Sequence, residues 1–112
     1  MPVLIRDVVQ EFCNQIKNIF GEQLSRMIVY GSYARGDYHS DSDVDILLTV
    51  DISPEDICAY RRAVAQVSSD LSLKHDVTIS VAVKAKQQFE KYAQELPYYQ
   101  NVLREGIRYG AS

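Results

Sequence analysis

The sequence predicts an α/β (α+β) fold in which helices cover one face of a small, mixed β-sheet. Segments with apolar residues three and four positions apart, the spacing of an amphipathic helix, alternate with short segments rich in valine, isoleucine and leucine. The chain has 112 residues, of which 46% are hydrophobic and 24% are charged. These proportions are typical of a globular protein, and this length accommodates one core. We therefore expect a single domain over residues 1–112.

The first half of the chain is predicted to fold as helix, strand, turn and strand. Apolar residues recur at helical spacing over residues 3–20, and Gly21 is a typical helix end. A short apolar strand follows over residues 24–30. After a polar turn, the sequence DVDILLTV predicts a second strand over residues 43–50.

The second half is predicted to contribute one long helix, a third strand and two short helices. The long helix covers residues 54–71, because proline occupies its first position and acidic residues its first turn. Residues 76–83 alternate with the period of a strand. One short helix passes through Phe89, and the last begins at Pro97 and ends at Gly106.

The strand periodicity predicts where the carboxylates lie. Successive side chains of a strand point to opposite faces of the sheet, so Asp43 and Asp45 share one face of the second strand. The apolar residues of that strand share the other face, which suits a helical layer. Asp76 begins the third strand with the same alternation. If the two strands are neighbours, the three carboxylates could converge on one side of the sheet.

The acidic residues are unevenly distributed. The net charge is −3, yet five aspartates and no lysine or arginine lie between Asp37 and Asp51. The overall charge therefore provides no attraction to a nucleic-acid template or an anionic membrane. The sequence shows no signal-peptide pattern and no apolar run near the ~20 residues of a membrane span. We expect a cytoplasmic protein in which Cys13 and Cys58 are reduced thiols.

Two neighbouring segments carry residue types that suit phosphate chemistry. Gly31 and Ser32 open a short helical turn, where free backbone N–H groups and close backbone approach favour an anion. Asp43 and Asp45 repel each other unless a cation lies between them, and their oxygens suit Mg²⁺. A third carboxylate at Asp76 would allow two metal ions. The combination predicts metal-dependent phosphoryl or nucleotidyl transfer.

The segment 31–45 reads G-S-x10-D-x-D and resembles the signature of a minimal nucleotidyltransferase (MNT) domain of the DNA polymerase beta superfamily. The similarity extends to Ala34-Arg35-Gly36, Ser42, Asp76 and the segment 103–107. It implies the nucleotidyltransferase fold of that superfamily, with Arg35 and Ser42 assisting nucleotide binding. Arg35 equally fits a residue that screens the acidic loop.

The resemblance also implies a role for each motif residue. Gly31 and Ser32 would hold the phosphates of a nucleoside triphosphate. Asp43 and Asp45 would bind two Mg²⁺ ions, and Asp76 would complete the site of the ion that activates the acceptor hydroxyl. A nucleoside monophosphate would be transferred from the α-phosphorus, and pyrophosphate would leave.

The small size of the chain bears on its partner. Members this small resemble the antitoxin half of HEPN–MNT toxin–antitoxin pairs, in which the MNT protein adenylylates a tyrosine of the helical HEPN protein. The resemblance thus implies an ATP- and Mg²⁺-dependent protein adenylyltransferase with a HEPN-type partner, in a homo- or hetero-oligomer. Two alternatives stay open: a two-component nucleotidyltransferase acting on a small hydroxylated molecule, and a non-catalytic antitoxin that neutralises its partner by binding.

Overall fold

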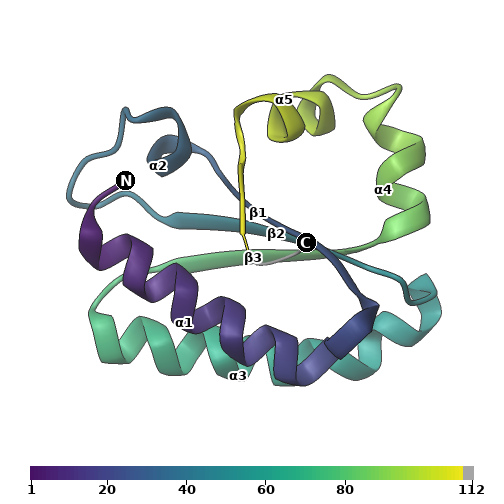
Figure 1. The fold of residues 1–112 in the computed structure, drawn as a ribbon, viewed down its shortest axis with the longest axis horizontal. Coiled ribbons are helices and arrows are strands. Elements are labelled where there is room, and N and C mark those ends of the chain that lie inside the picture. The colour runs from purple at the N-terminus through teal and green to yellow at the C-terminus, as the bar shows by residue number, and fades with distance from the viewer. Residues whose placement is uncertain (110–112) are drawn as a thin grey trace.

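The computed structural model describes residues 1–109, which form a four-stranded sheet with helices on both faces (Figure 1). In chain order the elements are α1 (Val3–Phe20), the 3₁₀ turn η1 (Gly21–Gln23), β1 (Leu24–Tyr30), α2 (Ser32–Arg35), β2 (Val44–Val50), α3 (Pro54–His75), β3 (Ile79–Ala85), α4 (Lys86–Ala93), α5 (Pro97–Glu105) and β4 (Ile107–Arg108). The predicted mixed α/β class and the order of its main elements are confirmed.

The sheet is mixed, with the strand order β3-β2-β1-β4. β2 runs parallel to β3 and antiparallel to β1, while β4 pairs antiparallel with the other edge of β1. The parallel pair needs a long crossover, which α3 supplies. In this register Tyr30 lies opposite Asp45, and Asp45 lies opposite Ser80. Side chains from three strands therefore form one row across the sheet.

The main core lies between the sheet and the layer formed by α1 and α3 (Figure 1). α1 buries the apolar stripe predicted from its spacing: Ile5, Val8, Val9, Phe12, Cys13, Ile16 and Phe20. β2 contributes Val44, Ile46, Leu48 and Val50 to the same core. Each such side chain contributes roughly 1.5–3 kcal/mol when it is fully buried.

The second face of the sheet is also covered by helices, which corrects the prediction of helices on one face. α4 and α5 pack there around a smaller cluster formed by Ile28, Leu47, Phe89 and Val102. The cause is that β1 and β2 carry apolar residues on both faces. At Gly106 the backbone passes so close to Ile28 that an added Cβ would overlap it. Figure 1 shows α4 and α5 over only part of this face, with α2 beside the remainder.

The boundaries around Asp76 differ from the prediction. α3 continues to His75, and β3 begins at Ile79 rather than at residue 76. Asp76 itself ends α3 in a left-handed conformation, with φ 54° and ψ 48°. The long helix extends past Leu71 because its last turn is tied to α1, where Glu11 accepts hydrogen bonds from Lys74 at 2.6 Å and lies 2.8 Å from His75. Across residues 1–109, no helix has both the length and the apolarity for a membrane crossing.

Candidate active site

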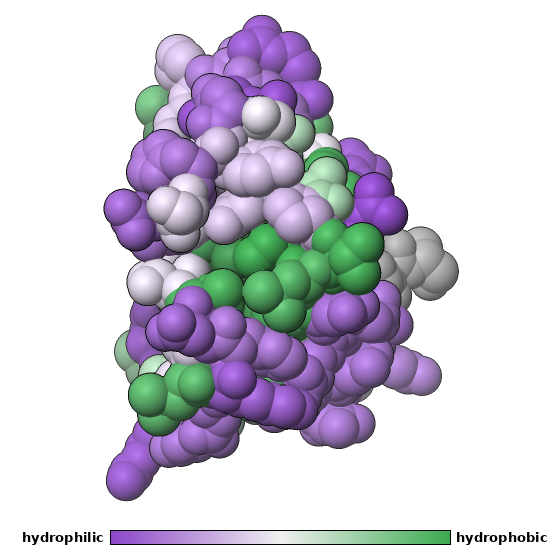
Figure 2. Space-filling model, turned by 90° about the vertical axis from the view of Figure 1, so that its left-hand side faces the viewer, coloured by the Kyte–Doolittle hydropathy of each residue, from purple (hydrophilic) through white to green (hydrophobic). Residues whose placement is uncertain are grey.

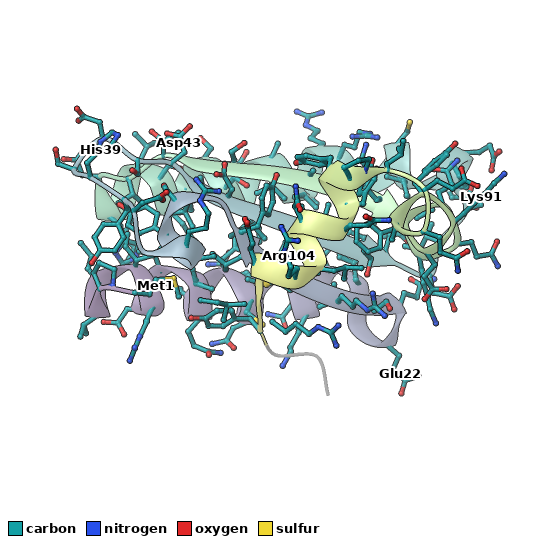
Figure 3. All side chains as sticks on the ribbon, turned by 90° about the horizontal axis from the view of Figure 1, so that it is seen from above. Met1, Glu22, His39, Asp43, Lys91 and Arg104 are labelled. Carbon is teal, nitrogen blue, oxygen red and sulfur yellow. The ribbon has the colours of Figure 1, made fainter. Side chains whose placement is uncertain are left out.

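The candidate site lies on the part of the second sheet face that α4 and α5 leave open. In the view from above, Asp43 and His39 lie at one end of the sheet, Arg104 of α5 lies over its middle, and Lys91 of α4 lies toward the opposite end (Figure 3). Asp45 and its strand neighbours Tyr30 and Ser80 form one row on this face of the sheet. The side chains of the next row are covered by α4 and α5. The open row is the floor of the site.

Asp43 and Asp45 form the electrostatic centre of this site. Asp43 directly precedes β2 and is exposed, whereas Asp45 lies within β2 and is half-buried. Burial raises the pKa of Asp45 above its ordinary value, and the negative charge of Asp43 raises it further, while Arg35 acts in the opposite direction. Two acidic oxygen donors under mutual repulsion are a donor set that fits a hard divalent cation such as Mg²⁺.

Gly31 brings the backbone against Asp45. It precedes α2 with φ 77° and ψ −154°, a conformation that is essentially restricted to glycine. A Cβ at this position would overlap the Asp45 carboxylate. Only glycine therefore allows the strand end, the turn into α2 and the carboxylate to occupy this space together. Ser32 is the first residue of α2, and the first N–H groups of a helix have no partner within it.

Asp76 does not join the pair, contrary to the prediction. No group of three or more histidine, cysteine, aspartate or glutamate side chains that could hold a metal ion occurs among the residues that the structure describes. The reason is the boundary of β3: Asp76 belongs to the end of α3, and the register places Ser80 opposite Asp45. Asp76 instead lines a polar cavity of about 340 Å³ with Asp41 and Ser72.

Arg35 and Ser42 make contacts within the protein. Arg35 lies 3.2 Å from Asp37 and 3.7 Å from Glu105, so it connects α2 both to the acidic loop and to the end of α5. Ser42 accepts a hydrogen bond from the backbone N–H of His39 at 2.9 Å and thereby closes the loop before β2. The pair with Asp37 fits the predicted role of screening the acidic loop, and the role of Arg35 in nucleotide binding stays a prediction. Both residues border the site.

Two tyrosines at the site were not identified from the sequence. Tyr30 faces the site from β1, and the Tyr98 hydroxyl of α5 donates a hydrogen bond to its hydroxyl at 3.1 Å. Burial raises the pKa of Tyr30 above its ordinary value, with smaller contributions from Tyr98 and from the charge of Asp45. One signal for Tyr30 is its position as the last residue of the predicted strand over residues 24–30, directly before Gly31 and Ser32. No comparable signal exists for Tyr98.

The arrangement suits a reaction at phosphorus. Paired carboxylates can hold a cation that neutralises phosphate charge, and a glycine turn beside them lets a phosphate approach the backbone. α2 and α5 flank the open row (Figure 1), and the Arg35–Glu105 pair at 3.7 Å joins α2 to the end of α5. These features provide positioning and electrostatic stabilisation, which dominate phosphoryl transfer.

Comparisons with known proteins identify the family of this chain. The family described as "Nucleotidyltransferase domain" matches residues 9–109. A relative from Methanocaldococcus jannaschii, named "Putative protein adenylyltransferase", is 35% identical over 85% of this chain and 94% of its own length. A second protein of that organism with the same description is 34% identical over 88% of this chain and 90% of its own.

Solved structures share the fold at low sequence identity. A toxin–antitoxin structure with AMP-PNP has a TM-score of 0.55 and 17% identity, covering 89% of this chain and 73% of the other. A mutant of the toxin–antitoxin pair MntA-HpeT has a TM-score of 0.55 and 16% identity, with the same coverage. The match over residues 9–109 and the two relatives above 30% identity establish that this chain belongs to the nucleotidyltransferase domain family.

Proposed function

We propose that this protein is a Mg²⁺-dependent adenylyltransferase that transfers AMP from ATP to a hydroxyl group of a partner protein. The observation that carries the proposal is the contact between Gly31 and the carboxylate of Asp45, with Asp43 beside it. It unites a phosphate-accessible turn with the two oxygen donors of a cation site. The two relatives' names, which describe protein adenylyltransferases, support the choice of transferred group and acceptor class.

The residues of the chain would act mainly by positioning. Asp43 and Asp45 would hold Mg²⁺, which, when bound, neutralises phosphate charge and favours ionisation of the acceptor hydroxyl. Gly31 and Ser32 would hold the β- and γ-phosphates through backbone N–H groups, as expected from the sequence. The acceptor oxygen forms a bond to the α-phosphorus, the bond from that phosphorus to the bridging oxygen breaks, and pyrophosphate leaves.

The biological role that we propose is that of an antitoxin whose partner is a HEPN-type toxin. The toxin–antitoxin structures with the same fold support this role. An exposed apolar surface also supports a protein partner. Figure 2 shows an apolar patch on the end of the molecule where α1 begins, and α1 leaves Val3 and Leu4 there 72% and 52% exposed. Exposed apolar patches frequently mark interaction surfaces.

The test is transfer to the product of the neighbouring gene. Purified chain, that partner, ATP labelled in the α-phosphate and Mg²⁺ are combined, and label on the partner is measured. We expect label with the wild type and none with Asp43→Ala. Asp51→Ala is the matched control, because Asp51 is an exposed aspartate just beyond the opposite end of β2. Its transfer rate should equal that of the wild type.

Two outcomes separate this proposal from its alternatives. Label on a small hydroxylated molecule but not on protein would show that the acceptor is a small molecule, and the transfer of AMP from ATP would still stand. An Asp45→Asn variant that transfers nothing yet still protects cells from the partner would show that binding suffices for neutralisation. Equal label with wild type and Asp43→Ala would contradict the assignment of the site.

A further inference from the structure

The hydroxyl of Tyr98 lies at the side of the candidate site. It donates a hydrogen bond to the Tyr30 hydroxyl at 3.1 Å, and Tyr30 lies opposite Asp45 in the β1–β2 register. Asp45 is also among the charged groups whose field acts on Tyr30. The Tyr98 side chain is nevertheless 55% exposed. Its phenol oxygen is therefore both accessible and directed toward the row that contains the carboxylate.

Ring packing fixes the position of Tyr98. Its ring meets Tyr30 edge-on with centroids 6.3 Å apart and meets Tyr99 edge-on at 5.3 Å. Tyr99 in turn packs edge-on against Phe89, which is buried in the second core cluster. Such edge-to-face pairs are favourable beyond the burial of their area. Tyr98 is thus held beside the site before any substrate binds.

The composition of the site favours a phenol as acceptor. Within the described part of the chain, Asp43 and Asp45 gather no third carboxylate, and Ser80 stands across from Asp45. A hydroxyl that ionises readily therefore suits this site better than an aliphatic alcohol. A phenol is a stronger acid than an aliphatic alcohol because its aromatic ring stabilises the negative charge on the oxygen.

We propose that Tyr98 is an acceptor for the enzyme's own reaction, so that the chain adenylylates itself at this residue when no partner is present. The inference rests on the proposed function and adds a modification site to it. The Tyr98 Oη forms a bond to the α-phosphorus of ATP, and the bond from that phosphorus to the bridging oxygen breaks. Pyrophosphate leaves, and the phenol proton passes to the solvent that reaches this half-exposed side chain.

The same geometry predicts how the modification proceeds. Because Tyr98 lies on the same chain as Asp45, transfer occurs within one molecule, and its rate constant is independent of protein concentration. Of the two tyrosines at the site, Tyr30 is partly buried within β1 and Tyr98 is exposed, so incorporation stops at one adenylyl group per chain. The product places a bulky phosphodiester where the Tyr98–Tyr30 hydrogen bond was.

The experiment uses the full chain without partner, ATP labelled in the α-phosphate and Mg²⁺. Intact mass counts the adenylyl groups, and peptide mapping locates them. We expect one group at Tyr98 in the wild type and none in Tyr98→Phe or Asp45→Asn. Tyr92→Phe is the matched control, because Tyr92 is 38% exposed and stacks on Tyr99 in the same aromatic cluster. It should incorporate one group, as the wild type does.

The outcomes distinguish this inference from the proposed function. Label on the partner protein together with none on the wild-type chain overturns self-modification and leaves the proposed function standing. Label on neither overturns both. Incorporation that is undiminished in Tyr98→Phe, or whose rate constant rises with protein concentration, also overturns the assignment to Tyr98 within one molecule.

Discussion

The substitution Gly31→Ala tests whether the close approach of Gly31 to Asp45 is what builds the site. It acts in two ways at once. The backbone at φ 77° and ψ −154° is unfavourable for any residue with a Cβ, and the added Cβ would overlap the Asp45 carboxylate. The first effect concerns only the local backbone, whereas the second displaces a candidate metal ligand.

The two effects can be given separate magnitudes. A non-glycine residue held in this region costs about 1–3 kcal/mol. Gly36→Ala supplies a control for backbone strain without overlap: Gly36 has φ 90° and ψ 4°, and nothing lies within 4 Å of its added Cβ. We expect it to cost about 1–2 kcal/mol. A carboxylate displaced by about 1 Å from its working position is expected to lower the transfer rate roughly 100-fold.

The assay is a double-mutant cycle read by denaturant unfolding, together with the rate of AMP transfer. Gly31→Ala is measured in the wild-type background and in the Asp45→Ala background. Asp45→Ala removes the carboxylate and keeps only the Cβ at position 45, which lies 3.5 Å from the Cβ added at position 31. The destabilisation should be smaller in the second background, by a coupling of about 0.5–3 kcal/mol. Transfer should be lost in Gly31→Ala and retained in Gly36→Ala.

A coupling of zero would refute the reasoning, because it would show that Gly31 and Asp45 do not share the space that the structure assigns to them. Equal transfer rates in Gly31→Ala and Gly36→Ala would refute the second part. That result would mean that the position of the Asp45 carboxylate has no influence on the reaction.

Three further substitutions test other parts of the structure. Because the fold raises the pKa of Asp45, its charged form destabilises the protein; without divalent cations, Asp45→Asn should melt at a higher temperature than wild type at neutral pH. The difference should be worth no more than about 1 kcal/mol at this solvated site and should shrink as the pH falls toward the ordinary carboxyl pKa of 3.8. Thr49→Val should stabilise the fold by about 1–2 kcal/mol in urea unfolding, because the buried Thr49 hydroxyl has no hydrogen-bond partner among the described residues, whereas exposed Thr78→Val should change little. Phe89→Ala should cost about 3–5 kcal/mol and expose the α5 amides to hydrogen exchange, since Phe89 centres the cluster that anchors α5; unchanged α5 protection would contradict this.

Local patterns were sufficient to predict most of the elements. The stripe from Ile5 to Phe20 has one strong period, so its structure follows from burial of one face. The segment after Leu71 has no such single period. It is decided by tertiary contacts, because Lys74 and His75 reach Glu11 of α1 and extend the helix beyond the apolar pattern.

The candidate site was predictable only in part, for a related reason. Asp43, Asp45 and Gly31 lie within one strand–turn–strand unit, so their spacing in the sequence determines their proximity. The position of Asp76 depends on where β3 begins. Residues 76–78 lie between the end of α3 and the start of β3, so Asp76 lies outside the strand. Tyr98 reaches the site through the packing of α5 on the second face of the sheet, and no local pattern reports that packing.

The division of the second sheet face into an open row and a covered row separates two kinds of evolutionary constraint. The carboxylates and the contact between Gly31 and Asp45 lie at the ends of β1 and β2. Both strands also supply buried residues to the next row, so few substitutions are tolerated in these two strands. α5 contributes only one wall, and its exposed side chains do not support the core. Substitutions at exposed positions of α5 should therefore change the surface beside the candidate site while leaving the two carboxylates in place.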